Sequence, residues 1–168
     1  MTQGTLYNYV RSKEDILFLV CDRLVQDYQD AVTAAINAEA DPARRLTAAL
    51  FAVAERMEVH QDDLLLLYQE VHALDRDGLR AVLKRVSEFI GDIVTLLEDS
   101  KGHGLLDFPD VYLGAEIITF LPVILALRRW PLAKHPDPSK IIAGLVSFMS
   151  RGLGVHALKV LEAVDGNP

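Results

Sequence analysis

The stretch GTLYNYVRSKEDIL, residues 4–17, places two tyrosines, an amide and two cations directly before an apolar run. Ser12, followed three residues later by Asp15, predicts the start of a long helix. A short helix over residues 3–10, a sharp turn and then a long helix is the arrangement of a recognition helix, whose hydroxyls and amides reach base edges. A solvated N-terminal turn has a similar composition, so these residues alone leave both interpretations open.

Downstream of this stretch, apolar residues recur at three- and four-residue steps and strand patterns are nearly absent, which predicts an all-α fold. The acid–proline pairs at 41–42 and 137–138, and the acid Asp75, are typical of helix starts. Pro122 falls inside a predicted helix, which its missing N–H should kink. The long predicted helices cover residues 13–38, 42–58, 61–73, 76–100, 109–132 and 138–163.

The composition is that of a globular protein with a sizeable core, since 51% of the 168 residues are hydrophobic and 24% are charged. The net charge of −7 argues against a generally basic nucleic-acid coat, although a local basic patch remains compatible with it. The single cysteine, Cys21, permits no internal disulfide, and its apolar neighbours predict a buried side chain rather than a reactive thiol. A reducing compartment, the cytoplasm, is therefore expected.

No stretch has the pattern of a secretion signal or a membrane span. Residues 1–15 are polar, and no small-residue cleavage site follows an apolar run there. The most apolar segment, residues 111–127, contains Glu116 and Pro122 and falls short of the ~20 clean apolar residues of a spanning helix. A buried helix is predicted in its place, with no membrane partner.

The segment TQGTLYNYVRSKEDIL, residues 2–17, resembles the end of the DNA-binding motif of TetR-family transcriptional regulators. In that family the recognition helix reads like Gly-Thr-Leu-Tyr-x-Tyr-Phe, and a Ser-Lys-Glu-x-Leu start opens the long connecting helix. Val10 stands where the family has phenylalanine, a departure within the apolar class. The matching residues are Gly4, Thr5, Leu6, Tyr7, Tyr9, Ser12, Lys13, Glu14 and Leu17.

The resemblance implies a TetR-like helical ligand-binding and dimerisation domain, residues 23–168, behind a partial DNA-binding head, residues 1–22. Two further helices precede this point in the family, so the helix-turn-helix is expected to be truncated and this chain to bind operator DNA weakly or not at all. A cloned fragment, a misplaced start codon and a natural fragment all stay open as explanations. By position, the resemblance assigns DNA contact to Thr2, Gln3, Gly4, Thr5, Tyr7, Tyr9 and Lys13.

A regulator of this family needs a sensor pocket, which the helices over residues 42–132 are expected to enclose. Residues 64–99 and 104–132 resemble sensor domains that respond to fatty acyl-CoA or other lipophilic molecules, so a small lipophilic effector is expected, with fatty acyl-CoA as one candidate. Arg128 and Arg129 fit an acyl-CoA phosphate and equally fit surface cations at a helix end. The candidate polar pocket residues are Tyr68, Glu70, His72, Tyr112, Glu116 and Trp130, each of which also has an ordinary structural explanation.

Metal binding and catalysis are not expected from this sequence. His60, Asp62, Asp63, Glu70 and His72 lie close together in the chain, but their spacing matches no known ligand set and no HExxH pair is present. There is also no nucleophile–base pairing and no phosphate loop. We therefore predict no metal, no cofactor and no enzyme.

The last two predicted helices are apolar and rich in small residues, which predicts that they pair with a second copy of the chain. Glycine costs ~1 kcal/mol at a helical site relative to alanine, so close helix packing should offset it in residues 141–158. A two-fold four-helix interface would place two recognition helices one DNA turn, or a multiple of it, apart. The predicted interface residues are Ile118, Leu121, Leu125, Ile142, Leu145, Phe148, Met149 and Leu153.

These observations predict a ligand-responsive transcriptional regulator. It would be a repressor that binds operator DNA as a homodimer and senses a lipophilic small molecule. The alternative is a helical dimerisation or interaction module without DNA or ligand function.

Overall fold

The computed structural model describes residues 12–155. The predicted recognition helix lies outside the described residues, and so does the end of the last predicted helix, from residue 156 onward. Six of the seven predicted DNA contacts are therefore outside them: Thr2, Gln3, Gly4, Thr5, Tyr7 and Tyr9.

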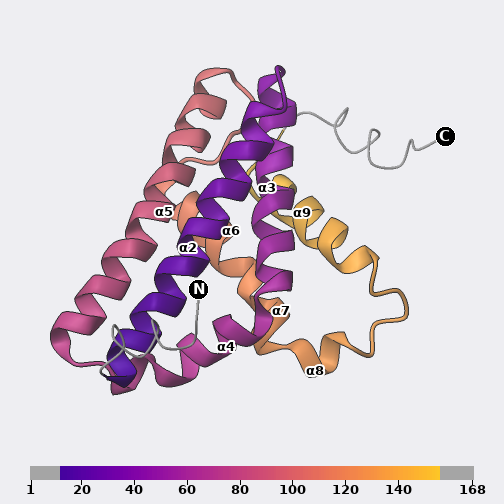
Figure 1. Ribbon diagram of the computed structural model, residues 1–168. Helices are drawn as coiled ribbons and strands as arrows, with labels where there is room; N and C mark the ends of the chain where they lie inside the picture. Colours follow the sequence, from indigo (N-terminus) through magenta and orange to yellow (C-terminus); the bar gives the residue numbers. More distant parts are fainter. Residues whose placement is uncertain (1–11, 156–168) are drawn as a thin grey trace.

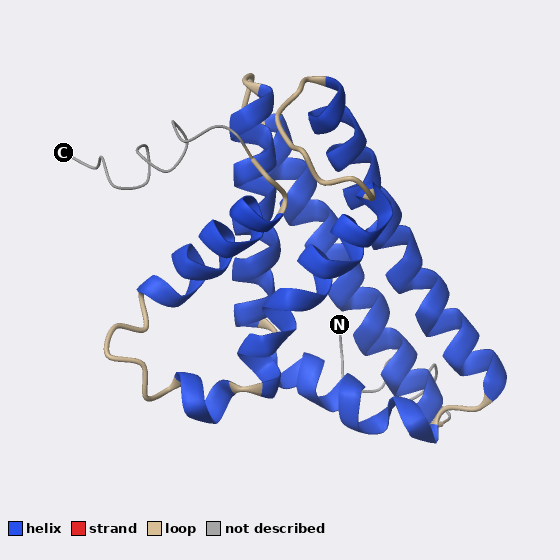
Figure 2. Cartoon of the chain, turned by 180° about the vertical axis from the view of Figure 1, so that it is seen from behind, coloured by secondary structure: helices blue, strands red, loops and turns tan. Residues whose placement is uncertain are grey.

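Within residues 12–155 the chain is built from helices without a strand, as the apolar spacing predicts. Figure 1 shows α2, α3 and α5 as long helices, with α4 crossing at the end where α2 begins. Figure 2, seen from behind, shows the loop that joins α8 to α9. The elements are α2 (Lys13–Asn37), α3 (Pro42–Val59), α4 (Gln61–Glu70), η1 (Val71–Ala73), α5 (Arg76–Gly102), α6 (Val111–Phe120), η2 (Leu121–Val123), α7 (Ile124–Leu127), α8 (Arg129–Leu132) and α9 (Lys140–Gly152).

Acidic and hydroxyl side chains cap the starts of α2, α3, α5 and α6. The capping box at α2 is confirmed, because the Ser12 hydroxyl accepts from the Asp15 N–H and the Asp15 carboxylate accepts from the Ser12 N–H, each at 3.1 Å. Asp41 and Asp75 cap α3 and α5 as predicted. The predicted start of the last helix at residue 138 is wrong: α9 begins at Lys140 without a side-chain cap, and the Asp137 carboxylate accepts from Ser139, the residue before the helix.

The predicted helix over residues 109–132 is divided into four short elements. Asp110 caps α6, and the α-helix then tightens into the 3₁₀ turn η2, which contains Pro122. Proline has no N–H to donate to the preceding turn, which explains why the break falls there. The two halves of the predicted helix have different neighbours, because α6 packs on α5 whereas α7 packs on α3 and α4.

The core lies where α2, α3, α5, α6 and α9 meet. Leu46 on α3 and Leu97 on α5 have no exposed surface. At Gly114 on α6, a β-carbon would lie 3.2 Å from the side chains of both Leu153 and Phe108, so the missing side chain permits this close packing. No helix in the described part of the chain is long and apolar enough to cross a membrane.

Removing the cap of α5 should lower stability measurably. The Asp75 carboxylate accepts from the Gly78 N–H at 2.7 Å, so Asp75→Ala should lower the free energy of unfolding by about 0.5–2 kcal/mol. Asp77→Ala is the matched control, because Asp77 only pairs with Arg80 on the exposed surface and should change stability by less than about 0.5 kcal/mol. Urea unfolding followed by circular dichroism measures both; equal effects would contradict the assigned cap.

Candidate functional site

A cavity of about 340 Å³ lies among α2, α4, α5 and α6. The buried stripe of α2 forms one wall, and α4 borders it because it crosses the end of that helix. Leu83, Val86 and Phe120 line the cavity but are 54%, 38% and 57% exposed, so the cavity reaches the surface beside them. The other lining residues are Cys21, Val25, Tyr28, Met57, Leu64, Leu67, Tyr68, Val71, Val82, Phe89, Ile90, Glu116, Thr119 and Val123.

The lining is almost entirely apolar, with few polar groups. The Thr119 hydroxyl is already used, since it donates to the Ala115 carbonyl on its own helix at 2.8 Å. Glu116 is the one charged side chain in the lining, and it is only partly buried. Tyr68 packs edge-on against Phe120, with 6.4 Å between ring centroids, and 40% of its surface is exposed. Such a wall suits an apolar ligand oriented by a small number of hydrogen bonds.

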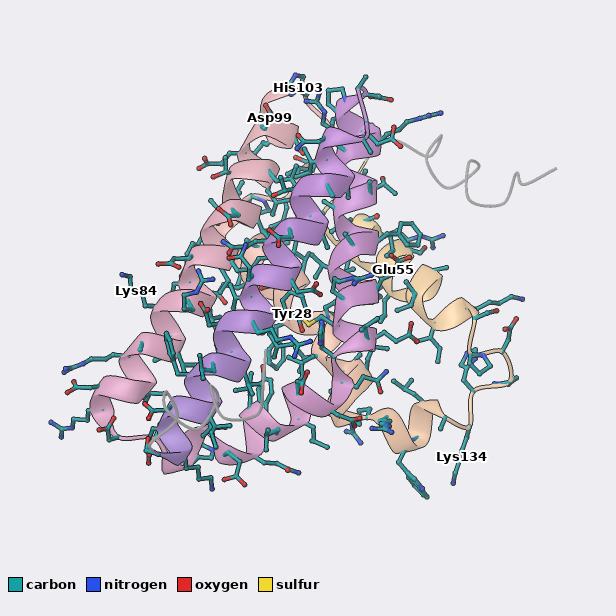
Figure 3. All side chains as sticks on the ribbon, viewed as in Figure 1. Tyr28, Glu55, Lys84, Asp99, His103 and Lys134 are labelled. Atoms are coloured by element: carbon teal, nitrogen blue, oxygen red, sulfur yellow. The ribbon has the colours of Figure 1, made fainter. Side chains whose placement is uncertain are left out.

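Tyr28 is the most deeply placed of these polar residues. Figure 3 shows it in the interior of the helical layer, whereas the labelled Lys84 and Lys134 project from the edges. Its ring lies 5.6 Å from that of Phe89 and 6.0 Å from that of His60, centroid to centroid. Burial raises the pKa of the Tyr28 hydroxyl, and nearby acidic charges raise it further, so it remains a neutral donor.

His60 joins α2 to α4 through its two ring nitrogens. Nε2 lies 2.8 Å from the Asp27 carboxylate and Nδ1 lies 3.3 Å from that of Asp63. The His60 ring also packs against the ring of Tyr28, so these contacts hold Tyr28 in the wall of the cavity. Within the described residues, no group of three or more His, Cys, Asp or Glu side chains has the arrangement of a metal site.

The structure brings two of the six predicted pocket residues to the cavity, Tyr68 and Glu116. Glu70 and His72 lie outside the lining: the Glu70 carboxylate pairs with Lys13, and His72 is exposed. Tyr112 and Trp130 also lie outside it. Both are exposed, at 62% and 73%.

Tyr112 and Trp130 have local partners on the surface. The hydrogen-bonded Glu116 carboxylate raises the pKa of Tyr112, which places Tyr112 beside a residue of the cavity. The Lys134 ammonium lies 3.9 Å from the centroid of the Trp130 ring, a cation–π contact. Neither Arg128 nor Arg129 lines the cavity, and Arg129 pairs with Asp62 on α4.

Lys13 is the only predicted DNA contact among the described residues, and it begins α2. Its ammonium pairs with the Glu70 carboxylate at the last residue of α4. More than half of the Lys13 side chain stays exposed. The pair therefore connects the end of α4, which lines the cavity, to the first turn of α2. The contact of Lys13 with DNA stays a prediction.

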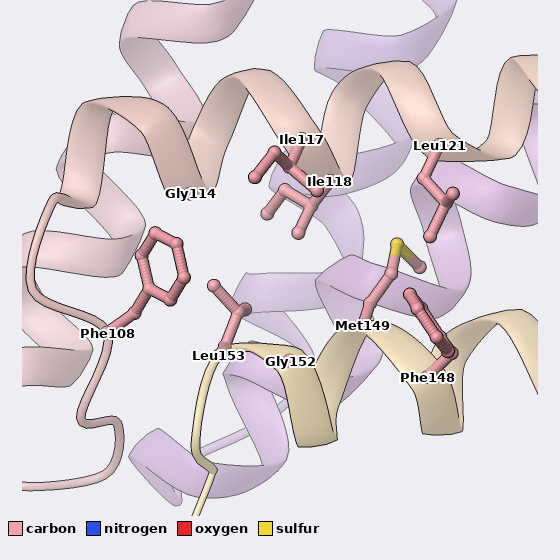
Figure 4. A pocket seen from close by; sticks show the side chains of 9 residues that line it. All are labelled: Phe108, Gly114, Ile117, Ile118, Leu121, Phe148, Met149, Gly152 and Leu153. Carbon is pink, nitrogen blue, oxygen red and sulfur yellow. The ribbon is translucent and has the colours of Figure 1, made fainter.

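A second apolar hollow of about 200 Å³ lies between α6 and α9. Figure 4 shows Ile117 and Leu121 above it, and Phe148 and Met149 of α9 below it. Apolar residues around this hollow are unusually exposed, with Phe148 at 66% and Ile117 at 44%. We call the exposed apolar residues of this side the α6–α9 face: Leu113, Ile117, Ile124, Leu127 and Phe148.

The predicted interface residues divide between this face and the core. Four of them pack within the chain itself, each at most 3% exposed: Ile118, Leu125, Met149 and Leu153. Leu121, Ile142 and Leu145 are partly buried, and Phe148 is exposed. The helices are those that the sequence indicates, but on α6 and α7 the outward residues are neighbours of the predicted ones.

Cys21 should be chemically inert in the folded protein. Burial raises the pKa of its thiol to about 11, and 2% of the residue is exposed. The thiolate is the reactive form, so alkylation by iodoacetamide at pH 7.5 should be at least about a hundredfold slower in the native protein than in urea. Mass spectrometry of quenched samples measures both rates; equal rates would contradict a buried, protonated thiol.

These features define a class of fold: an all-helical body with an apolar cavity beside its longest helices and an apolar face on its last ones. Comparison with known proteins supports the same all-helical fold class. No family model matches the chain, and no curated protein matches it. Solved structures do match, however, and their likeness shows a TetR-like fold.

Three of these solved structures illustrate the likeness. A bacterial regulatory protein of the TetR family from Rhodococcus RHA1 superposes with a TM-score of 0.77 at 20% identity, over 92% of this chain and 81% of that one. The TetR-family regulator PfmR from Thermus thermophilus gives 0.71 at 19%, over 91% and 83%. The fatty acid degradation regulator FadR from Bacillus halodurans gives 0.69 at 16%, over 91% and 83%.

Proposed function

We propose that this protein is a TetR-type transcriptional repressor that binds operator DNA as a homodimer and responds to a small lipophilic effector. The observation that carries the proposal is the pairing of an apolar cavity with a separate exposed apolar face in one TetR-like fold. The three neighbours described above are regulators, and one is named for fatty acid degradation. A fold alone does not fix a function, so the proposal rests on these two surfaces.

The cavity supports the sensing role. Its volume of about 340 Å³ falls within the range of roughly 300–1,000 Å³ that small-molecule sites occupy. Its walls are apolar and its mouth is open between Leu83, Val86 and Phe120. An apolar effector that fills it would remove these side chains from water, which is the main source of affinity at such a site.

The α6–α9 face supports the dimer. Monomeric soluble proteins rarely expose a large contiguous apolar patch, and patches of this kind mark interfaces. The face contains Phe148 at 66% and Ile117 at 44% exposure, residues whose burial would stabilise a pair of chains. We infer a two-fold contact in which α6 and α9 of each copy meet their equivalents.

The path from effector to DNA is proposed to run through α4. Leu64, Leu67 and Tyr68 of α4 line the cavity, and Glu70 at its end pairs with Lys13 at the start of α2. An effector that changes the position of α4 would act directly on the first turn of α2, next to the predicted recognition helix. Signalling then requires only that the effector bind the two positions of α4 with unequal affinity.

DNA selection tests the regulator proposal. Because this chain alone is expected to bind operator DNA weakly, the protein is produced together with any in-frame codons that precede Met1. It is incubated with fragmented genomic DNA of its source at low salt, and retained fragments are sequenced, with and without a lipid extract of the same cells. We expect enrichment of one palindromic site that the extract reduces. A protein that is dimeric and binds apolar molecules but enriches no site would contradict the regulator proposal and favour the interaction module.

A further inference from the structure

Tyr28 carries a hydrogen-bonding group that the protein itself does not use. Within residues 12–155, its hydroxyl is the buried side-chain oxygen or nitrogen that lacks a hydrogen-bond partner. The residue is 4% exposed and lines the cavity. A buried polar group without a partner is destabilising, and such groups are rare in folded proteins. The Tyr28 hydroxyl therefore needs a hydrogen-bond partner that the described residues do not supply.

The neighbours of Tyr28 explain why no side chain satisfies it. His60, the nearest ring with polar atoms, has both nitrogens occupied by Asp27 and Asp63. Phe89 packs on the ring of Tyr28 and offers no hydrogen-bonding group. Tyr28 lines the cavity beside Cys21 and Tyr68, so the space next to its side chain is that of the cavity.

The charges around the cavity restrict what can occupy it. No lysine, arginine or histidine is in the lining, and its one charged residue, Glu116, is acidic. Asp27 and Asp63 add negative charge on the inner side, close enough to raise the pKa of Tyr28. A carboxylate or phosphate inside the cavity would find no cation in the lining to offset the cost of its burial, because the nearby Arg56 and Arg85 already pair with acidic side chains of the protein.

We infer that the cavity binds a compact, neutral and mainly apolar molecule with one hydrogen-bond acceptor, a carbonyl of the ketone or ester class, to which the Tyr28 hydroxyl donates. This inference rests on the proposed sensing role and specifies the chemical class of the effector. It disfavours a free fatty acid or the phosphates of an acyl-CoA as the buried part of the effector. The polar group lies at the inner end of the cavity, and the apolar chain extends toward the mouth at Leu83 and Phe120.

Four probes of equal chain length test the inference: methyl nonyl ketone, undecane, undecanoate and undecylamine. Each displaces a bound apolar fluorophore, N-phenylnaphthylamine, from the purified protein. We expect the ketone to bind about tenfold more tightly than the hydrocarbon, and the two charged probes to bind more weakly than the ketone. In Tyr28→Phe the ketone should lose this tenfold advantage, whereas hydrocarbon binding should not weaken.

Tyr68→Phe is the matched control. It removes a hydroxyl from the same cavity, but Tyr68 is 40% exposed and its hydroxyl can bind water in the absence of a ligand. The ketone advantage should therefore persist. The carbonyl stretch of the bound ketone gives a second readout on the unaltered protein: its infrared frequency should be lower than in hexane, as expected for a hydrogen-bonded carbonyl.

The outcomes separate this inference from the proposed function. Tightest binding by undecanoate or undecylamine, an unchanged ketone advantage in Tyr28→Phe, or an unshifted carbonyl stretch would overturn the inference and leave a lipophilic sensor intact. Failure of all four probes to bind would overturn both. A Tyr28-dependent ketone preference in a protein that selects no DNA would support the inference and remove only the regulator.

Discussion

Phe148→Asp should convert the dimer into monomers. Phe148 is the residue of the α6–α9 face that lies on α9, and it is 66% exposed in the single chain. In a two-fold contact each dimer would carry the new carboxylate twice, buried among apolar residues without a cation. Burying an unpaired charge costs several kcal/mol, so the dissociation constant should rise roughly a thousandfold or more. Sedimentation velocity at micromolar concentration measures the change.

Val59→Asp is the matched control for this substitution. Val59 ends α3 and is 64% exposed, almost the same as Phe148, but it is not part of the α6–α9 face. This variant should sediment as the unaltered protein does. Dissociation by both substitutions, or by neither, would show that α6 and α9 do not form the contact. Circular dichroism confirms that each variant is folded.

Val25→Phe should strongly weaken effector binding without unfolding the protein. Val25 is 4% exposed and lines the cavity from α2, so a phenyl ring there occupies space that the effector needs. Forcing a ligand into an overfilled site costs about 1–3 kcal/mol, so methyl nonyl ketone should bind up to roughly a hundredfold more weakly. Displacement of N-phenylnaphthylamine measures the affinity.

Val20→Phe provides the comparison, because Val20 lies on the same helix, is partly buried and is absent from the cavity lining. It should leave ketone affinity within about twofold. Equal losses in both variants would indicate a general disturbance of α2. Unchanged affinity in Val25→Phe would place the binding site elsewhere.

Local features of the fold could be predicted because their causes are local. The capping box of Ser12 and Asp15 depends on residues three apart, and the break at Pro122 depends on one missing N–H. The start of α9 differs from the one predicted at Asp137-Pro138, because the Asp137 carboxylate bonds Ser139, which precedes the helix, and does not cap the first turn of α9. The spacing of residues along the sequence does not predict which hydrogen-bond donor the Asp137 carboxylate will accept from.

The candidate site was less predictable because it depends on contacts distant in the sequence. Periodicity places Tyr28 on the inward stripe of α2, but it gives no sign that His60 is already occupied by Asp27 and Asp63. Only that arrangement leaves the Tyr28 hydroxyl without a partner. Glu70, chosen for the pocket by its place among apolar residues, turns outward to Lys13.

The outward face of the last helices follows the helical repeat across η2. A continuous helix over residues 109–132 would place Ile118, Leu121 and Leu125 on one stripe. The structure keeps this spacing through Leu121–Val123, but that stripe packs inward, and Ile124 and Leu127 lie on the exposed side. The prediction therefore identified the helices of the pairing face and shifted its residues by one position on α6 and α7.

The central claim is that this chain is a paired sensor with an apolar effector cavity. Native mass spectrometry of the protein tests both halves in one measurement, as purified and after addition of methyl nonyl ketone. We expect two chains in one complex that retains at least one small apolar molecule or takes up the added ketone. Single chains that neither carry nor acquire any bound mass would contradict the account.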